Sequence, residues 1–397
     1  MKLAILTAGS STHTKGLMNF VCEEARQMYK RQNKDFSCDV FMIREKRTKG
    51  LENLICLLRK GKKTIPAPDE GKPSFEMDGV TFHNIWIKEG IISFLVRSQM
   101  YHKPISRNNC NKVIETLKGY DYIIAHNTIS QYSCYKLKEF LGIPFGAFWH
   151  GSELTTSTFL NRNTYKITKE ILENANDNFF VSKSLQNIAS SITSPTNPQV
   201  IYTGPSEGFY KYSEKRKNEL RKQFGVLEDD IVVAYAGNLV PIKNVLVLPA
   251  IFKKIKEECR EKNFKFWIIG NGELENELRL LLEQSNIDFV MHGKVLPSRM
   301  PDYMNCIDIL LLISKKEGLG LVCLEAMKCG ANVFGSKVGG IPEVVGEDHC
   351  APLDDFFVPN LSKLIINSIR NNEEKGYSED VFSWKSAIDT ILAKINV

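Results

Sequence analysis

The strongest constraint on the fold is a strand, a glycine turn and a helix that follow one another in the last third of the chain. The apolar run 308–313 (DILLLI) is short and bounded by polar residues, which is typical of a buried strand. A turn with Gly318 and Gly320 follows, and LVCLEAMKCG then has helical spacing. The first N–H groups of this helix, near Leu321 and Val322, have no partner within the helix, and glycine lets the backbone approach a ligand. Such a helix start favours anions.

Two carboxylates frame this turn. Glu317 lies on the turn, and Glu325 lies about one helical turn inside the helix. Carboxylates accept hydrogen bonds, so they suit hydroxyl groups rather than phosphates. A ligand with a diphosphate in the middle and a polyol at each end would use both features, and a nucleotide-activated sugar has that shape. The alternative is an ordinary strand–helix unit in which both glutamates are solvated.

This stretch resembles the large retaining glycosyltransferase family numbered four. That family has a glutamate, a glycine–aromatic–glycine turn, a second glutamate eight positions after the first, and a GGIPE-like loop. The matching residues here are Glu317, Gly318, Gly320, Glu325, Cys329, Gly330 and 339–343, with Leu319 where an aromatic residue is common. The resemblance implies an α/β protein of GT-B architecture, in which two Rossmann-like domains face each other across a cleft.

The length of 397 residues and the alternation of strands and helices predict two domains. Residues 1–205 form one alternating series, turn signals follow at 203–208, and a fresh series begins after them. We therefore predict an N-terminal Rossmann-like domain, 1–205, and a C-terminal one, 206–379. The resemblance implies that the first domain binds the acceptor, that the second binds the nucleotide-sugar, and that a C-terminal helix at about 380–397 completes the first.

The positive charge of the chain is concentrated in its first half. Residues 1–200 hold 27 Lys and Arg against 18 Asp and Glu, whereas the remainder holds 25 against 28. The densest basic segment is 44–63. It lacks any nucleic-acid-binding module or aromatic platform, so we expect no nucleic-acid partner. Two interpretations of the helix expected at 50–63 stay open: an apolar stripe packed on the sheet with lysines in water, or a basic end that, with the apolar segment 91–96, contacts an anionic membrane surface.

Cysteine usage and the apolar runs point to a cytoplasmic protein. The ten cysteines are scattered without a Cys-x-x-Cys pair, which favours buried reduced thiols over disulfides or zinc ligation. The first apolar run, 2–7, is too short for a secretory signal, and no run approaches the roughly 20 residues that span a bilayer. We expect a cytoplasmic location, with peripheral association at the inner face of the membrane as the second interpretation above would require.

Two strands of the first domain end in histidine. His126 follows YDYIIA and His150 follows IPFGAFW, and ligands of open α/β sheets collect at the carboxyl ends of strands. An imidazole there can donate to a sugar hydroxyl. The resemblance implies that His150 approaches the donor sugar, that His126 lies toward the acceptor, and that Lys15 and Gly16 belong to a glycine loop over the active site. A structural role remains the alternative for each histidine.

In the second domain, cations and glycines follow the strands. Gly237 permits a tight turn after YA, and Lys243 stands where its ammonium could meet a phosphate. The resembling family has an arginine where this chain has Asn238, which supplies no charge. Gly270 ends the next strand, although the glycines there could merely form a tight turn. The resemblance further implies that Lys294 and Val295 contact the nucleobase.

These residues together predict a retaining glycosyltransferase without a metal or other cofactor. The donor would be a UDP-sugar, with GDP-mannose next, and the acceptor a glycan or lipid-linked glycan in envelope polysaccharide or glycoconjugate synthesis. The catalytic residues would be His150, Lys243 and Glu317. The predicted donor-binding residues are Gly16, Gly237, Asn238, Lys243, Gly270, Lys294, Val295, Glu317, Gly318, Leu319, Gly320, Leu321, Val322 and Glu325. Two alternatives are a sugar-nucleotide 2-epimerase and a non-catalytic nucleotide-sugar binder, the latter suggested by Asn238.

Overall fold

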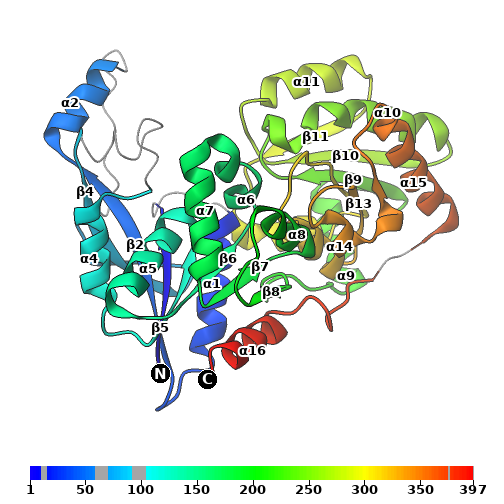
Figure 1. The fold of residues 1–397 in the computed structure, drawn as a ribbon. Coiled ribbons are helices and arrows are strands. Elements are labelled where there is room, and N and C mark those ends of the chain that lie inside the picture. The colour runs from blue at the N-terminus through cyan, green and yellow to red at the C-terminus, as the bar shows by residue number, and fades with distance from the viewer. Residues whose placement is uncertain (10–15, 59–69, 92–103, 374–375, 397) are drawn as a thin grey trace. The chain divides into compact units, whose positions relative to one another are not determined.

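A computed structural model describes residues 1–9, 16–58, 70–91, 104–373 and 376–396. The chain divides into two compact units, Met1–Ile201 with Lys385–Val397, and Tyr202–Trp384. The predicted limits were 1–205 with about 380–397, and 206–379. Each unit is an α/β structure built on its own sheet, as two Rossmann-like domains require (Figure 1).

Unit 1 contains an eight-stranded sheet in the order β3-β4-β2-β1-β5-β6-β7-β8. All neighbouring strands pair in parallel except β3 and β4, which are antiparallel. The elements are β1 Lys2–Ala8, α1 Gly16–Tyr29, β2 Ser37–Arg47, α2 Lys49–Leu58, β3 Ser74–Met77, β4 Val80–Glu89, α4 Arg107–Leu117, β5 Tyr122–His126, α5 Asn127–Leu141, β6 Phe145–Trp149, α6 Ser152–Thr155, the 3₁₀ helix Ser157–Leu160, α7 Arg162–Asn174, β7 Asp177–Phe180, α8 Lys183–Ile192 and β8 Pro198–Val200.

The central strands of unit 1 are mostly apolar, as expected for a parallel sheet with helices on both faces. Every residue of β5 and β6 is buried. The sequence predicted these strands and the mostly parallel sheet, but it did not predict β3. Its four residues, SFEM, are too short for a clear alternation, and they are held by pairing with β4 across the turn at Asp78 and Gly79, both of which have positive φ.

Unit 2 contains a six-stranded parallel sheet in the order β11-β10-β9-β12-β13-β14. Its elements are α9 Glu214–Gln223, β9 Asp230–Ala236, 3₁₀ helices Pro241–Lys243 and Val245–Val247, α10 Leu248–Glu258, β10 Asn263–Ile269, α11 Glu275–Gln284, β11 Phe289–Gly293, the 3₁₀ helix Pro297–Arg299, α12 Met300–Met304, β12 Ile309–Leu312, α13 Leu321–Lys328, β13 Asn332–Ser336, α14 Ile341–Val345, the 3₁₀ helix Glu347–His349, β14 Cys350–Ala351 and α15 Phe357–Asn371.

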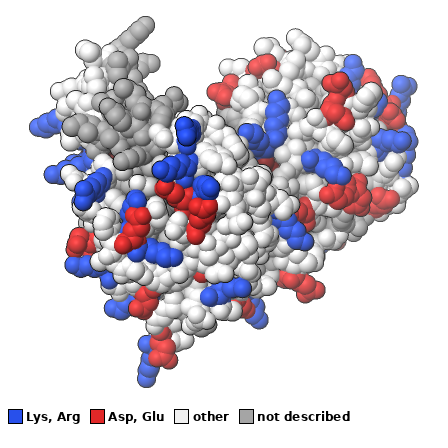
Figure 2. Space-filling view, viewed as in Figure 1, with Lys and Arg blue, Asp and Glu red and all other residues white. Residues whose placement is uncertain are grey.

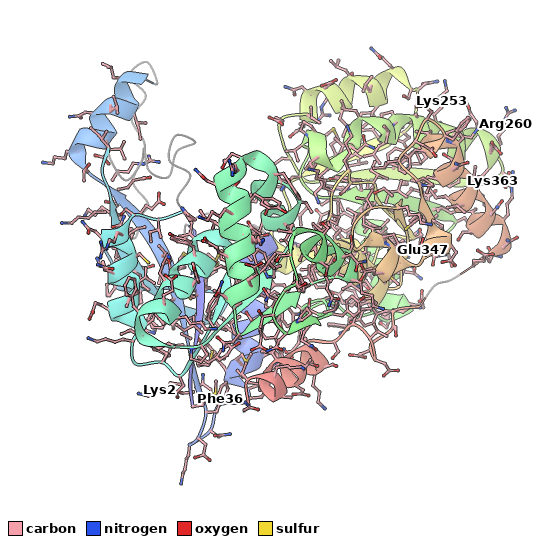
Figure 3. All side chains as sticks on the ribbon, viewed as in Figure 1. Lys2, Phe36, Lys253, Arg260, Glu347 and Lys363 are labelled. Atoms are coloured by element: carbon pink, nitrogen blue, oxygen red, sulfur yellow. The ribbon has the colours of Figure 1, made fainter. Side chains whose placement is uncertain are left out.

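One face of the unit 2 sheet is covered by α10, α11 and α15, whose apolar sides form a single core with β9, β10 and β12. Their polar sides point outward, as Lys253 and Arg260 at α10 and Lys363 on α15 show (Figure 3). Near the ends of these two helices, the Arg370 guanidinium donates to the carbonyl of Glu258 at 3.0 Å. Burial of this face fixes the sheet, so that the loops after its strands are held in place.

The last helix, α16 (Trp384–Lys394), belongs to unit 1 from Lys385 onward. It lies beside α1 (Figure 1), where Nη2 of Arg31 is 2.7 Å from a carboxylate oxygen of Asp389. Ile388 and Ile391 are buried, so the apolar side of α16 also contributes to the core.

Candidate functional site

The loops after the parallel strands of unit 2 are brought together by glycines that tolerate no side chain. A Cβ on Gly270 would lie 1.9 Å from the carbonyl oxygen of Gly237, and both residues have positive φ. Similarly, a Cβ on Gly339 would lie 1.9 Å from the carbonyl oxygen of Glu317, again at positive φ. Only glycine fits such close approaches. The turn after β10 is therefore packed on the turn after β9, and the GGIPE loop on the turn after β12.

Lys243 and Glu317, predicted to hold different parts of the donor, form an ion pair with each other. Nζ of Lys243 is 2.6 Å from Oε2 of Glu317, and both side chains are about one-fifth exposed. Ser314 donates its hydroxyl to the same carboxylate oxygen at 3.2 Å. The backbone N–H of Lys315 donates to the carbonyl of Ile242 at 2.8 Å, which ties the two loops together. The pair is thus partly screened from water and oriented by backbone contacts.

Helix α13 begins directly after Gly320, which has a φ of 93°. A Cβ on this residue would lie 2.9 Å from the Leu312 side chain. Its N-terminal N–H groups, at Leu321 and Val322, follow the turn that carries Glu317. These are the orphan donors of a helix start, so this edge of the sheet combines an ammonium group with a partial positive charge.

Glu325 lies on α13 and is only partly exposed. Burial raises the pKa of its carboxyl to about 8. No described residue forms a salt bridge or hydrogen bond with this carboxyl group that would offset the loss of water. A partly buried carboxyl group of this kind fits a ligand that supplies hydroxyl donors.

The other predicted donor-binding residues of unit 2 lie on the same edge of the sheet. Asn238 is exposed, and its carbonyl accepts the Tyr235 hydroxyl at 2.9 Å. Gly318 and Leu319 are buried beside Glu317. Lys294 and Val295 follow the edge strand β11, whose end is connected to β10 by the N–H of Gly270, 2.8 Å from the carbonyl of Gly293. The structure therefore gathers these residues at the carboxyl ends of the strands, and their roles stay predictions.

In unit 1 the two histidines contact each other. Nδ1 of His126 is 2.8 Å from Nε2 of His150. His126 is fully buried, and its expected place toward the acceptor stays a prediction. His150 is partly exposed, and chiefly burial holds its pKa well below the usual value. His150 is therefore a neutral imidazole.

A glutamate that the sequence did not single out completes this group. Nε2 of His126 is 2.8 Å from Oε2 of Glu24 on α1, and both side chains are fully buried. A charged residue on the inner face of an amphipathic helix was the available signal. Of the glycine-loop residues, Gly16 begins α1, and Lys15 lies outside the described residues.

The basic segment 44–63 is only partly a surface feature. Arg44 is buried, with its guanidinium 4.5 Å from the ring centroid of Trp86. Lys46 and Arg47 each lie 3.7 Å from a carboxylate, those of Glu70 and Glu89. The basic end of the predicted helix and most of the segment 91–96 lie outside the described residues. Elsewhere on the visible face, basic and acidic side chains are interspersed (Figure 2).

The described residues contain no cluster of three or more His, Cys, Asp or Glu side chains that could hold a metal ion. The described cysteines carry no disulfide. None of the helices in these ranges combines the length and apolar character needed to cross a bilayer.

Comparison with solved structures finds the same fold in other proteins. HepE from Anabaena, solved in complex with UDP, superposes over 100% of both chains with a TM-score of 0.72 at 16% identity. Two relatives are an uncharacterized glycosyltransferase of Methanocaldococcus jannaschii, 27% identical over 79% of this chain and 84% of its own, and N-acetyl-alpha-D-glucosaminyl L-malate synthase of Bacillus anthracis, 30% identical. The last match covers 42% of each chain, so this chain spans less than half the length of that relative.

The two Rossmann-like units therefore have the GT-B fold. Residues 216–379 match the family described as glycosyl transferases group 1. The matched range includes the stretch around Glu317 and Glu325 from which the resemblance was drawn.

Proposed function

We propose that this protein is a retaining glycosyltransferase that moves a hexose or N-acetylhexosamine from a nucleotide-sugar to a glycan or lipid-linked acceptor. The observation that carries the proposal is the Lys243–Glu317 pair at the start of α13, 2.6 Å apart on the glycine-lined edge of unit 2. It places a cation, a helix start and a carboxylate within one site, which suits a diphosphate joined to a sugar.

The chemistry requires that the leaving nucleotide diphosphate be stabilised as negative charge grows on it. Lys243 and the N–H groups at the start of α13 would supply that stabilisation. A diphosphate would attract the Lys243 ammonium, so Glu317 would exchange its ionic partner for the hydroxyl groups of the donor sugar. Glu325 would accept the hydroxyl groups of the ribose, and Lys294 and Val295 would contact the base.

Two details rest on likeness alone. UDP is the nucleotide in the HepE complex, which favours a UDP-sugar over GDP-mannose here. Retention of configuration, and attack on the face from which the diphosphate leaves, come from the resembling family. We assign acceptor binding to unit 1 and the approach to the donor sugar to His150, and we expect no metal requirement.

The first experiment measures binding and turnover of UDP-, GDP- and ADP-sugars by calorimetry and product analysis, with and without EDTA. One UDP-sugar should bind and turn over, and Lys243→Ala should lower turnover about 100-fold because a charged contact to the leaving group is lost. Lys265→Ala is the matched control, since Lys265 also pairs with a carboxylate, that of Asp288 at 2.9 Å, but lies within β10. Equal turnover in wild type and Lys243→Ala would overturn the proposal.

The second candidate is a non-catalytic nucleotide-sugar binder. Two observations favour it: Asn238 brings no charge to the diphosphate, and Lys243 is already paired with Glu317 rather than free to meet a phosphate. Tight UDP-sugar binding without turnover in any acceptor mixture would support it. A sugar-nucleotide 2-epimerase would instead convert its donor in the absence of acceptor. Flotation of the protein with anionic vesicles tests the lipid-linked acceptor and membrane contact.

A further inference from the structure

Unit 1 holds a buried row of three titratable side chains that the proposed reaction does not yet use. Glu24 lies 2.8 Å from His126, and the other ring nitrogen of His126 lies 2.8 Å from His150. The row runs from a fully buried carboxylate on α1 to a partly exposed imidazole after β6. His126 ends β5 and His150 follows β6, and each is followed by a residue with positive φ, Asn127 or Gly151, which turns the backbone away there.

The rings in this row are fixed in place by aromatic packing. Phe148 stacks on His126 and on His150, with centroids 5.2 and 5.0 Å apart. The ring of Phe20, one turn before Glu24 on α1, meets His150 edge-on at 4.6 Å. Neither imidazole can therefore exchange its nitrogens by rotation without breaking these contacts.

The order of protons along the row follows from the end that holds the carboxylate. Apart from this 2.8 Å approach, neither Nε2 of His126 nor the two Glu24 oxygens has a hydrogen-bond partner among the described residues. With Glu24 as a carboxylate that can only accept and one proton on each ring, the 2.8 Å contacts fix the order of the protons. His126 must then hold its proton on Nε2, facing Glu24, which leaves Nδ1 as an acceptor. His150 must donate from Nε2, which leaves its own Nδ1 without a proton.

We propose that Glu24 and His126 are positioning residues that hold His150 as the Nε2–H tautomer and so present Nδ1 as a hydrogen-bond acceptor to a hydroxyl group of the sugar. This rests on the proposed transferase function and specifies one part of it, because His150 accepts a hydrogen bond from the hydroxyl rather than donating one. A group that can only accept, such as a phosphate or carboxylate oxygen, is disfavoured at this position. The site therefore selects a sugar that carries a free hydroxyl there.

Other ionisable groups near the row must be included. Glu153 on α6, which accepts the N–H of Gly151 at 3.1 Å, is buried and has a raised pKa, chiefly because of burial. Cys38 on β2 is buried near Glu24, and burial raises the pKa of its thiol well above the usual value. The Glu153 carboxyl is held by the Gly151 backbone, and the Cys38 thiol keeps its proton. Glu24 is therefore the residue that sets the proton order.

The test has a spectroscopic part that needs no substrate. Long-range ¹H–¹⁵N correlation at about pH 8 on the ¹⁵N-histidine-labelled full chain reports which nitrogen of each ring is protonated, with His150→Gln assigning the signal. We expect His150 to be protonated on Nε2 in wild type and on Nδ1, or on both in exchange, in Glu24→Gln. Glu23→Gln is the matched control, because Glu23 is the neighbouring buried carboxylate and contacts Arg26 and Gln27 instead. A His150 tautomer that is the same in wild type and Glu24→Gln would overturn the proposal.

The kinetic part is a double-mutant cycle. Glu24→Gln should lower kcat/KM about tenfold in the wild-type background and cause no further loss in the His150→Gln background, because it acts through that ring. Equal losses in both backgrounds would show that Glu24 affects folding or another residue, and would refute its positioning role. Thermal melting of each variant checks folding. If no nucleotide-sugar is turned over at all, the proposed function fails, while the tautomer measurement still decides the proton order.

Discussion

Replacing Glu325 by glutamine should make the protein more stable and less able to bind its donor. Burial raises the pKa of this carboxyl from 4.5 to about 8. Between these values the folded protein keeps the proton and the unfolded chain releases it, so the wild type loses stability as the pH rises. Glutamine keeps the shape of the protonated side chain and does not titrate.

The magnitude follows from the pH window. At pH 7 the folded protein holds a proton that an ordinary glutamate has lost, at a cost of about 3 kcal/mol if burial acts in full. Because the side chain is partly exposed, water offsets some of this, and we expect about 2 kcal/mol. Glu325→Gln should therefore be about 2 kcal/mol more stable than wild type at pH 7. This difference in the free energy of unfolding should be small at pH 5 and should increase as the pH rises.

Urea unfolding of both proteins at several pH values measures the gain, with Glu219→Gln, an exposed position on α9, as the control. Calorimetry with UDP-glucose in two buffers of different ionisation enthalpy then tests the role of Glu325. Ribose hydroxyls should favour the carboxylate, so binding at pH 7 should release a proton in wild type and none in the variant. A stability difference that does not change with pH would refute the raised pKa. Unchanged UDP-glucose affinity in the variant would refute the ribose contact.

Other substitutions test the remaining parts of the site. Gly339→Ala should lower the free energy of unfolding by about 1–3 kcal/mol and abolish donor turnover, because its Cβ would lie 1.9 Å from the Glu317 carbonyl. Gly119→Ala, where a Cβ would meet open space, should have neither effect. Urea unfolding and turnover assays compare the two variants. Asn238→Arg should tighten diphosphate binding severalfold by adding a charge at an exposed position, as calorimetry with UDP would show. Lys243→Met should weaken UDP binding, and a UDP affinity equal to that of wild type would exclude a contact between the ammonium and the diphosphate.

The positions of the glycine turns after β9, β10 and β12 were readable from the sequence because each follows a short apolar run. Short apolar runs followed by glycine predicted the strands β9, β10 and β12 and the turns after them, and the helix α13 was predicted with its start. The close approaches that explain Gly270 and Gly339 were not readable, since they join residues far apart in the chain. The sequence indicated that glycine was needed, and the structure shows which carbonyl excludes a side chain.

The pairings within the site could not be predicted for a similar reason. Nothing local connects Glu24 to His126, or Lys243 to Glu317, because each pair spans several strands and helices. The two strand-end histidines were predicted to lie at the same edge of the sheet, but the burial of His126 depends on α1 and on the Phe148 ring. For Glu24, the local signal was a charged residue on the buried side of α1.

The two carboxylates of the donor site differ in how their charge is balanced, and this difference separates their roles. Glu317 is already compensated by Lys243 and Ser314, so a ligand must exchange those contacts for its own. Glu325 has no hydrogen-bond or ion-pair partner among the described residues and holds its proton to about pH 8, so a ligand that donates hydrogen bonds gains by ionising it. A diphosphate joined to two polyols would satisfy both requirements at once: it draws Lys243 away from Glu317 while supplying hydroxyl groups to both carboxylates. A free sugar or a free phosphate would satisfy only one, so we expect either fragment alone to bind much more weakly than the intact nucleotide-sugar.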